Sequence, residues 1–130
     1  MNFNLIDQKS KRLLFAITGL SIILLISFTI ASSKDPGYVK RLLPFQKLVE
    51  DLHPSELCAD CEVIRTPRSK HCAICNKCVE RFDHHCPWLN SCVGINNHNA
   101  FLVFISSLLL ILICTTVSSF FTVFDECHPK

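Results

Sequence analysis

The chain has 130 residues, enough for one small domain, and 49% of them are hydrophobic. Its formal net charge of +2 at pH 7 is too small to indicate a nucleic-acid-binding protein, so we expect no nucleic acid partner. The apolar residues gather in two long runs, and this distribution favours a membrane protein over a soluble domain.

We expect a short polar N-terminal tail over residues 1–12 and a first transmembrane helix over residues 13–33. These 21 residues contain no charged side chain, and about 20 apolar residues cross a bilayer as a helix. A cleaved signal peptide is the alternative, because Lys9, Lys11 and Arg12 resemble its basic lead. The membrane span is favoured because the apolar run exceeds the usual length of about 7–15 residues and no small-x-small cleavage site follows it.

Residues 34–57 form a connector that starts with Asp35-Pro36-Gly37, a turn signal. Apolar residues follow at loosely helical spacing, although Pro44 argues against one continuous helix. Two interpretations are open: an interfacial amphipathic segment held against anionic lipid, or a linker packed on the module that follows. The apolar residues are Tyr38, Val39, Leu42, Leu43, Phe45, Leu48, Val49 and Leu52.

Residues 58–98 form a cysteine-rich module with little signal for regular structure. Seven of the nine cysteines and three of the six histidines lie between Cys58 and Cys92. A module of about 40 residues cannot build an adequate core alone, so we expect metal coordination to supply the folding energy. We expect no internal repeat longer than the Cys-x2-Cys pairs.

A second transmembrane helix is expected over residues 99–124, followed by a tail over residues 125–130. The segment from Lys34 to His98 carries nine of the 13 Lys and Arg residues, so the positive-inside rule places the module in the cytosol. Disulfides are rare in that compartment, and clustered cysteines there are metal ligands or catalytic groups.

The module offers more metal ligands than two zinc sites need. Structural zinc takes four thiolate or imidazole ligands, so two sites use eight of the ten Cys and His residues and leave two over. Spacing alone does not say which two, and a plain double zinc module with an incidental Cys and His is one interpretation. The other is chemical: Asp83-His84-His85-Cys86 puts an acid, an imidazole and a thiol within four residues, and a base oriented by a third group activates a nucleophile.

The stretch from Cys58 to Phe101 resembles the cysteine-rich domain of the DHHC family of protein S-acyltransferases, the palmitoyltransferases. The family spacing stands here over 44 residues as Cys58-x2-Cys61-x9-His71-Cys72-x2-Cys75-x2-Cys78-x4-Asp83-His84-His85-Cys86-x5-Cys92-x4-Asn97-x3-Phe101. The Asp35-Pro36-Gly37 turn after a membrane helix is a further family feature.

The resemblance implies two structural zinc ions and a separate catalytic group. One zinc would be held by Cys58, Cys61, His71 and Cys78, and the other by Cys72, Cys75, His85 and Cys92. Cys86 would then be the nucleophile, His84 the base and Asp83 the group that orients it. The implied reaction moves a fatty acyl group from an acyl-CoA such as palmitoyl-CoA to Cys86, and from there to a cysteine of a protein substrate. Candidates for the CoA phosphates are Arg65, Arg68, Lys70, Lys77 and Arg81.

The expected fold class is a mainly α membrane protein, in which two transmembrane helices flank a small cytosolic module folded around two zinc ions. The resemblance implies a membrane of the endomembrane system: Golgi, endoplasmic reticulum or plasma membrane. Family members usually have four transmembrane helices, so the first and fourth, with the TTxE motif beyond, are expected to be missing from a truncated chain.

A homo- or hetero-oligomer is then expected to complete the bundle around the acyl chain, through small and polar residues of the helices. These residues are Gly19, Ser21, Ser106, Ser107, Thr115, Thr116, Ser118 and Ser119. The alternative function is a catalytically silent, membrane-anchored zinc module that binds partner proteins. For Cys114 and Cys127, outside the module, we expect no special role.

Overall fold

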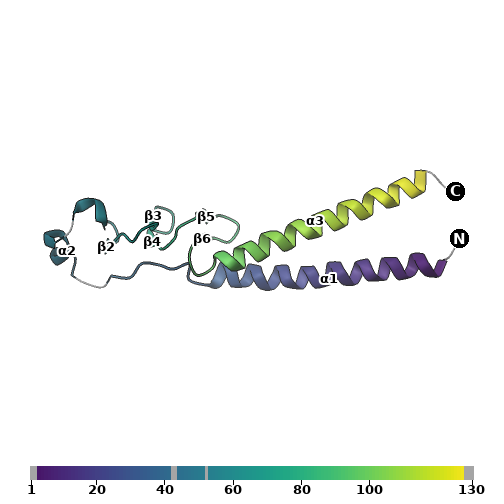
Figure 1. Ribbon diagram of the computed structural model, residues 1–130, viewed down its shortest axis with the longest axis horizontal. Helices are drawn as coiled ribbons and strands as arrows, with labels where there is room; N and C mark the ends of the chain where they lie inside the picture. The colour runs from purple at the N-terminus through teal and green to yellow at the C-terminus, as the bar shows by residue number, and fades with distance from the viewer. Residues whose placement is uncertain (1–2, 42–43, 52, 128–130) are drawn as a thin grey trace. The chain divides into compact units, whose positions relative to one another are not determined.

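The computed structural model describes residues 3–41, 44–51 and 53–127. Within this part of the chain lie three α-helices, one short 3-10 helix (Pro54–Glu56) and six β-strands (Figure 1). The connector residues Leu42, Leu43 and Leu52, for which helical spacing is expected, lie outside the described residues. The chain divides into two compact units, one of which is Phe28–Phe101 and holds the cysteine-rich module.

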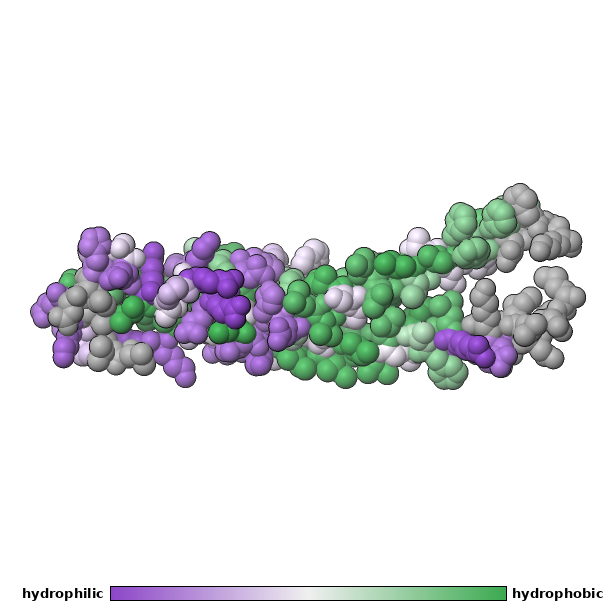
Figure 2. All heavy atoms as spheres, in the orientation of Figure 1, coloured by the Kyte–Doolittle hydropathy of each residue, from purple (hydrophilic) through white to green (hydrophobic). Residues whose placement is uncertain are grey.

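The two long helices are α1 (Phe3–Ser33) and α3 (His98–Cys127). Their segments Ser10–Ser33 and His98–Phe124 are, within the described residues, long and apolar enough to cross a membrane, and only 6% of the most apolar window of each is buried. Apolar side chains cover these helices, whereas hydrophilic side chains gather over the module (Figure 2). The prediction of an apolar helix on each side of the module is confirmed, although α1 begins well inside the expected polar tail.

Among the described residues, the module is built from three antiparallel hairpins. Hairpin 1 pairs β1 (Leu57–Cys58) with β2 (Val63–Ile64). Hairpin 2 pairs β3 (Lys70–Cys72) with β4 (Lys77–Val79). Hairpin 3 pairs β5 (His84–Cys86) with β6 (Ser91–Val93).

The hairpins share one register. The residue pairs that close their four-residue turns are Cys58–Val63, Cys72–Lys77 and Cys86–Ser91. The last turn residue adopts a left-handed conformation in each hairpin, with φ of 53° at Glu62, 50° at Asn76 and 48° at Asn90. Equivalent positions therefore recur every 14 residues. The prediction that no repeat exceeds the Cys-x2-Cys pairs was wrong, because residues 71–79 and 85–93 share their register and also carry the same His, Cys, Asn, Cys and Val at equivalent positions.

The connector packs on the module directly after its turn. The Oδ1 atom of Asp35 accepts hydrogen bonds from the N–H groups of Gly37 and Tyr38, at 2.8 and 2.9 Å, which forms the expected turn. Tyr38 then forms an isolated β-bridge with Val79. Of the two interpretations of the connector, packing on the module holds for this part of it.

The rest of the connector is partly helical. Helix α2 (Phe45–Asp51) begins directly after Pro44, whose carbonyl accepts the N–H of Lys47 at 3.1 Å. Proline is tolerated at the start of a helix but not inside one. This position explains why one continuous helix does not form.

A buried asparagine ties the module to the helix ends. The side chain of Asn97, fully buried, donates to the carbonyls of Ala31 at 3.0 Å and Cys92 at 2.9 Å, and accepts from the N–H of Gly94 at 2.9 Å. One amide therefore joins the end of α1, hairpin 3 and the start of α3. All of its hydrogen bonds are needed, because a buried amide is stable only when its polar atoms are bonded.

Candidate functional site

The first ligand group consists of Cys58, Cys61, His71 and Cys78, whose ligand atoms all lie within 4.8 Å of one another. Its Cys-x2-Cys pair comes from the turn of hairpin 1, and its His and Cys face each other across hairpin 2. The Nδ1 atom of His71 lies 3.1 to 4.0 Å from the three sulfur atoms.

The second ligand group, Cys72, Cys75, His85 and Cys92, repeats this plan one hairpin later. Its Cys-x2-Cys pair comes from the turn of hairpin 2, and its His and Cys face each other across hairpin 3. The Nδ1 atom of His85 lies 3.3 to 3.8 Å from the three sulfur atoms. Both expected sets of four are brought together.

The spacing within the groups fits tetrahedral zinc. With Zn–S bonds of about 2.3 Å and Zn–N bonds of about 2.0–2.1 Å, the edges of such a site are about 3.6 Å from nitrogen to sulfur and about 3.8 Å between sulfurs. The nitrogen–sulfur distances scatter around the first value, and the sulfurs of Cys75 and Cys92 lie 3.4 Å apart. The donor set of three thiols and one imidazole is also one that zinc prefers.

Crowding of the thiols gives a second argument for a cation. Burial, together with the neighbouring thiols, raises the pKa of Cys78 and of Cys92 well above the ordinary value. Burial also acts on Cys58 and Cys72, but hydrogen bonds from backbone N–H groups and neighbouring side chains outweigh it and lower the pKa of both. Each cluster thus holds thiols that resist ionising together, and a divalent cation would compensate the charge of several thiolates at once.

Alternation along short strands explains how the module shares out its ligands. Successive side chains of a strand point to opposite faces, so in hairpin 2 His71 serves one group and Cys72 the other. In hairpin 3, His85 joins the second group, and the opposite face carries His84 and Cys86. Cys86 belongs to neither ligand group and is almost fully buried.

The acid and imidazole expected beside Cys86 are close to each other. The Nδ1 atom of His84 lies 3.5 Å from the Oδ2 atom of Asp83. The His84 ring also meets Phe101 edge to face, with 5.2 Å between ring centroids. The backbone N–H of Asp83 donates to the carbonyl of Val93 at 3.0 Å, which fixes the acid to hairpin 3.

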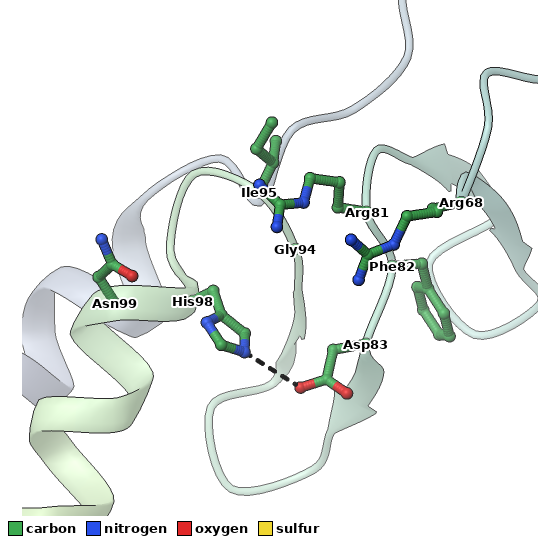
Figure 3. Close-up of a pocket in the computed structure, with 8 residues that line it drawn as sticks. All are labelled: Arg68, Arg81, Phe82, Asp83, Gly94, Ile95, His98 and Asn99. Atoms are coloured by element: carbon green, nitrogen blue, oxygen red, sulfur yellow. Dashed lines mark ion pairs between the residues drawn. The ribbon is translucent and has the colours of Figure 1, made fainter.

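A second imidazole, which the sequence reasoning missed, also faces Asp83. The Nε2 atom of His98 lies 3.7 Å from the same Oδ2 atom (Figure 3). His98 begins α3, 15 residues after Asp83, and no metal-ligand spacing singles it out. The carboxylate of Asp83 therefore lies between two imidazoles from different elements.

A pocket of about 290 Å³ opens beside this acid. Figure 3 shows the side chains of Arg68, Arg81 and His98 directed into the same space. The remaining lining residues are Phe82, Asp83, Gly94, Ile95 and Asn99. Two guanidinium groups at its wall suit an anionic ligand, because guanidinium binds phosphate and carboxylate through paired hydrogen bonds.

The sequence of this chain is similar to those of known proteins. The family model described as DHHC palmitoyltransferase matches residues 51–130. Palmitoyltransferase Hip14 of Drosophila melanogaster is 38% identical over 99 residues, which cover 69% of this chain and 16% of that protein. Palmitoyltransferase SWF1 of Kluyveromyces lactis is 36% identical over 115 residues, covering 85% and 36%. Palmitoyltransferase ZDHHC9 of Homo sapiens is 55% identical over 56 residues, covering 43% and 15%.

This chain thus spans at most 36% of the length of these three relatives. The match to the family model nevertheless covers more than half of the chain and includes both ligand groups and the segment from Asp83 to Cys86. The chain belongs to the DHHC palmitoyltransferase family.

Proposed function

We propose that the protein is a protein S-acyltransferase in which Cys86 carries the acyl group. The observation that supports this most is the separation of Cys86 from both ligand groups, on the strand that also carries His84. A thiol that is a metal ligand shares its electron pair with the metal, whereas a thiol beside an imidazole base can attack a carbonyl carbon.

His84 acts as the base in this proposal, and Asp83 selects its tautomer. Because Nδ1 faces the carboxylate of Asp83, the proton stays on Nδ1 and leaves Nε2 free to accept a proton. The Cys86 thiol gives its proton to Nε2, and the sulfur forms a bond to the thioester carbonyl carbon of an acyl-CoA. The carbon–sulfur bond to CoA then breaks, and CoA leaves as a thiol with the proton from His84.

The second half of the reaction reverses these roles. A cysteine thiol of a protein substrate gives its proton to His84 and attacks the acyl-Cys86 thioester, which restores the Cys86 thiol. One thioester replaces another in each half, so the bonds made and broken are nearly equal in energy. Placement and an activated thiol are therefore the main contributions expected of the protein.

The eight residues of the two ligand groups would hold structural zinc. Bound zinc would supply folding energy to a module that lacks a large apolar core. The reacting groups in the proposal are the chain's own Cys86, His84 and Asp83.

The pocket beside Asp83 is our candidate for CoA phosphates. Arg68 and Arg81 line it and are two of the five basic residues that the sequence singles out, the others being Arg65, Lys70 and Lys77. Phosphate bound there would set the CoA portion next to the acid of the proposed site.

We also propose that α1 and α3 cross an endomembrane bilayer with the module in the cytosol. The exposed apolar side chains of both helices support burial in lipid, and the basic residues between them support this orientation. A second copy or a partner chain would then complete the helix bundle around the acyl chain. The proposed segments are an N-terminal tail (1–12), a first membrane helix (13–33), a connector (34–57), the cysteine-rich module (58–98), a second membrane helix (99–124) and a C-terminal tail (125–130).

The test is acyl labelling of the full-length chain in lipid nanodiscs. Incubation with palmitoyl-CoA is expected to give a hydroxylamine-sensitive acyl group on Cys86, and none on the Cys86→Ser variant. The variant should hold the same zinc per chain as the wild type, which shows that the module still folds. Two bound zinc ions with no acyl-enzyme would instead identify a silent, membrane-anchored zinc module.

A further inference from the structure

The three hairpins carry the same four-residue turn, and the third residue of that turn (Cys61, Cys75 or Leu89) decides whether the turn supplies a second sulfur ligand. We propose that Leu89 keeps the Cys86 sulfur out of metal coordination, so that hairpin 3 is a zinc knuckle converted into the site of a free nucleophile. This inference rests on the proposed function of Cys86.

Position in the repeat is the first argument. Cys86 occupies the place that Cys58 holds in hairpin 1 and Cys72 holds in hairpin 2, with the same pairing across the strands. Three residues later hairpins 1 and 2 have a second cysteine, and hairpin 3 has Leu89. The left-handed residue that follows is retained, with φ of 48° at Asn90. Hairpin 3 therefore has the backbone of a zinc knuckle but only one of its two sulfur ligands.

Hydrogen bonding in the turns is the second argument. In hairpin 3 the backbone N–H of Leu89 donates to the carbonyl oxygen of Cys86 at 3.2 Å. That bond is the one found in an ordinary β-turn, and Pro87 follows Cys86 at the position where such turns favour proline.

Burial is the third argument. Leu89 and Cys86 are both 4% exposed, so the leucine side chain fills protein space beside the turn rather than extending into solvent. An apolar side chain offers no electron pair, and one thiol without a chelating neighbour does not make a four-ligand zinc site. The sulfur of Cys86 thus stays free although two ligand groups lie within the same small module.

The inference predicts that one substitution converts the turn of hairpin 3 into a metal-binding turn. In Leu89→Cys, hairpin 3 regains the Cys-x2-Cys spacing of hairpins 1 and 2, and Cys86 becomes half of a chelate. A sulfur that shares its electron pair with zinc is a weaker nucleophile than a free thiolate. Leu89→Ser is the matched control, because it has nearly the size of cysteine and makes the same cavity without offering a sulfur.

Zinc per chain and acyl labelling are measured on the full-length variants in nanodiscs, under reducing conditions, in zinc-buffered and zinc-supplemented medium. Leu89→Cys supplies two of four zinc ligands, and the remaining places are left to His84, on the same face of the strand as Cys86, and to solvent. This variant is therefore expected to bind a third zinc equivalent only in supplemented medium and to lose acyl labelling about tenfold there, relative to buffered medium. The wild type and Leu89→Ser are expected to keep two zinc equivalents and zinc-independent labelling. Adding Cys86→Ser to Leu89→Cys is expected to remove the third equivalent.

The inference is overturned if folded Leu89→Cys holds only two zinc equivalents, if its third zinc leaves labelling unchanged, or if the wild type itself binds a third. Should Leu89→Cys hold fewer than two, Leu89→His, which offers an imidazole ligand, is measured in its place under the same criteria. Absence of labelling on the wild type would refute the proposed function instead, while the zinc count would still report on Leu89.

Discussion

Hairpins 2 and 3 have the same strand register and turn length, but they carry different chemical groups. Both pair three residues with three, in the same register, around a four-residue turn, and Cys72 and Cys86 are equally buried at 4% exposure. Neither burial nor strand register therefore separates a metal ligand from a proposed nucleophile in this module. The difference lies in the side chains at equivalent positions.

Three of those positions carry the contrast. Ser69, Lys70 and Cys75 of hairpin 2 correspond, 14 residues later, to Asp83, His84 and Leu89 of hairpin 3. The first two changes bring an acid and an imidazole to the strand, and the third removes a metal ligand. The same small scaffold thus serves structural and chemical purposes with few changes of side chain.

The largest effect that tests this comparison is expected from Cys72→Ser. Loss of one ligand should release zinc from the second group, whose binding free energy in comparable small modules is on the order of 10–16 kcal/mol and is largely folding energy. The variant should hold one zinc or none, and amide hydrogen exchange should show hairpins 2 and 3 open. Cys86→Ser, at the equivalent position, is the control and should keep both zinc ions. Equal zinc loss from the two variants would contradict the distinction between the hairpins.

Gly94→Ala should come next, because Gly94 lies where the two hairpins meet the connector. A Cβ atom there would stand 2.5 Å from the carbonyl oxygen of Pro36 and 2.5 Å from a methyl carbon of Val79. The first of these is backbone and cannot turn aside, so we expect a loss of stability of about 3 kcal/mol from overpacking. Chemical unfolding followed by zinc release measures it.

Gly19→Ala provides the matched control, since nothing lies within 4 Å of the added atom. Within a helix this change should be neutral or stabilise by about 0.5–1 kcal/mol. If both variants unfolded at the same denaturant concentration, the close packing at Gly94 would carry no energetic weight.

Asn97→Ala should affect hairpin 3 more than hairpin 2, because the Asn97 amide bonds to Cys92 and Gly94 but to no residue of hairpin 2 among the hydrogen bonds described. Removing it leaves buried carbonyl and N–H groups unpaired, and each such group lowers the stability of the fold by about 1–3 kcal/mol. Hydrogen exchange should rise first in hairpin 3. Asn97→Asp keeps the acceptor for Gly94 but sets a carboxylate against two carbonyl oxygens, so it should rescue nothing. Uniform opening of both hairpins would count against selective anchoring.

The apolar helices and the ligand groups were predicted from different features of the sequence. The long charge-free runs identified the helices directly, since length and hydropathy determine a membrane span. The ligand groups needed the family resemblance, because ten candidates for eight places leave the pairing open. The hairpin register stayed hidden, since a turn built around metal ligands carries little of the alternating apolar pattern that identifies strands.

His98 marks the other limit of what the sequence could predict. Its approach to Asp83 depends on where α3 begins relative to hairpin 3, and that is fixed by the hydrogen bonds of Asn97 and by the backbone bond from His98 N–H to the Gly94 carbonyl at 3.0 Å. Such long-range bonds leave no periodic trace in the residue order. A histidine at the edge of a cysteine-rich module is also easily taken for a spare ligand.

The smallest effect is expected from His98→Leu, which tests whether the acid of hairpin 3 needs its second imidazole. Both side chains of the Asp83–His98 pair are about half exposed, 48% and 43%, so solvent screens the interaction and its loss should cost well under about 1 kcal/mol of stability. The rate of acyl-Cys86 formation should fall about two- to fivefold, because Asp83 then has more freedom to turn away from His84. His98→Gln, which keeps an N–H donor, should recover most of that rate. A loss as complete as that in Cys86→Ser would instead make His98 a reacting group, and hairpin 3 would then depend on α3 for its chemistry as well as for its anchoring.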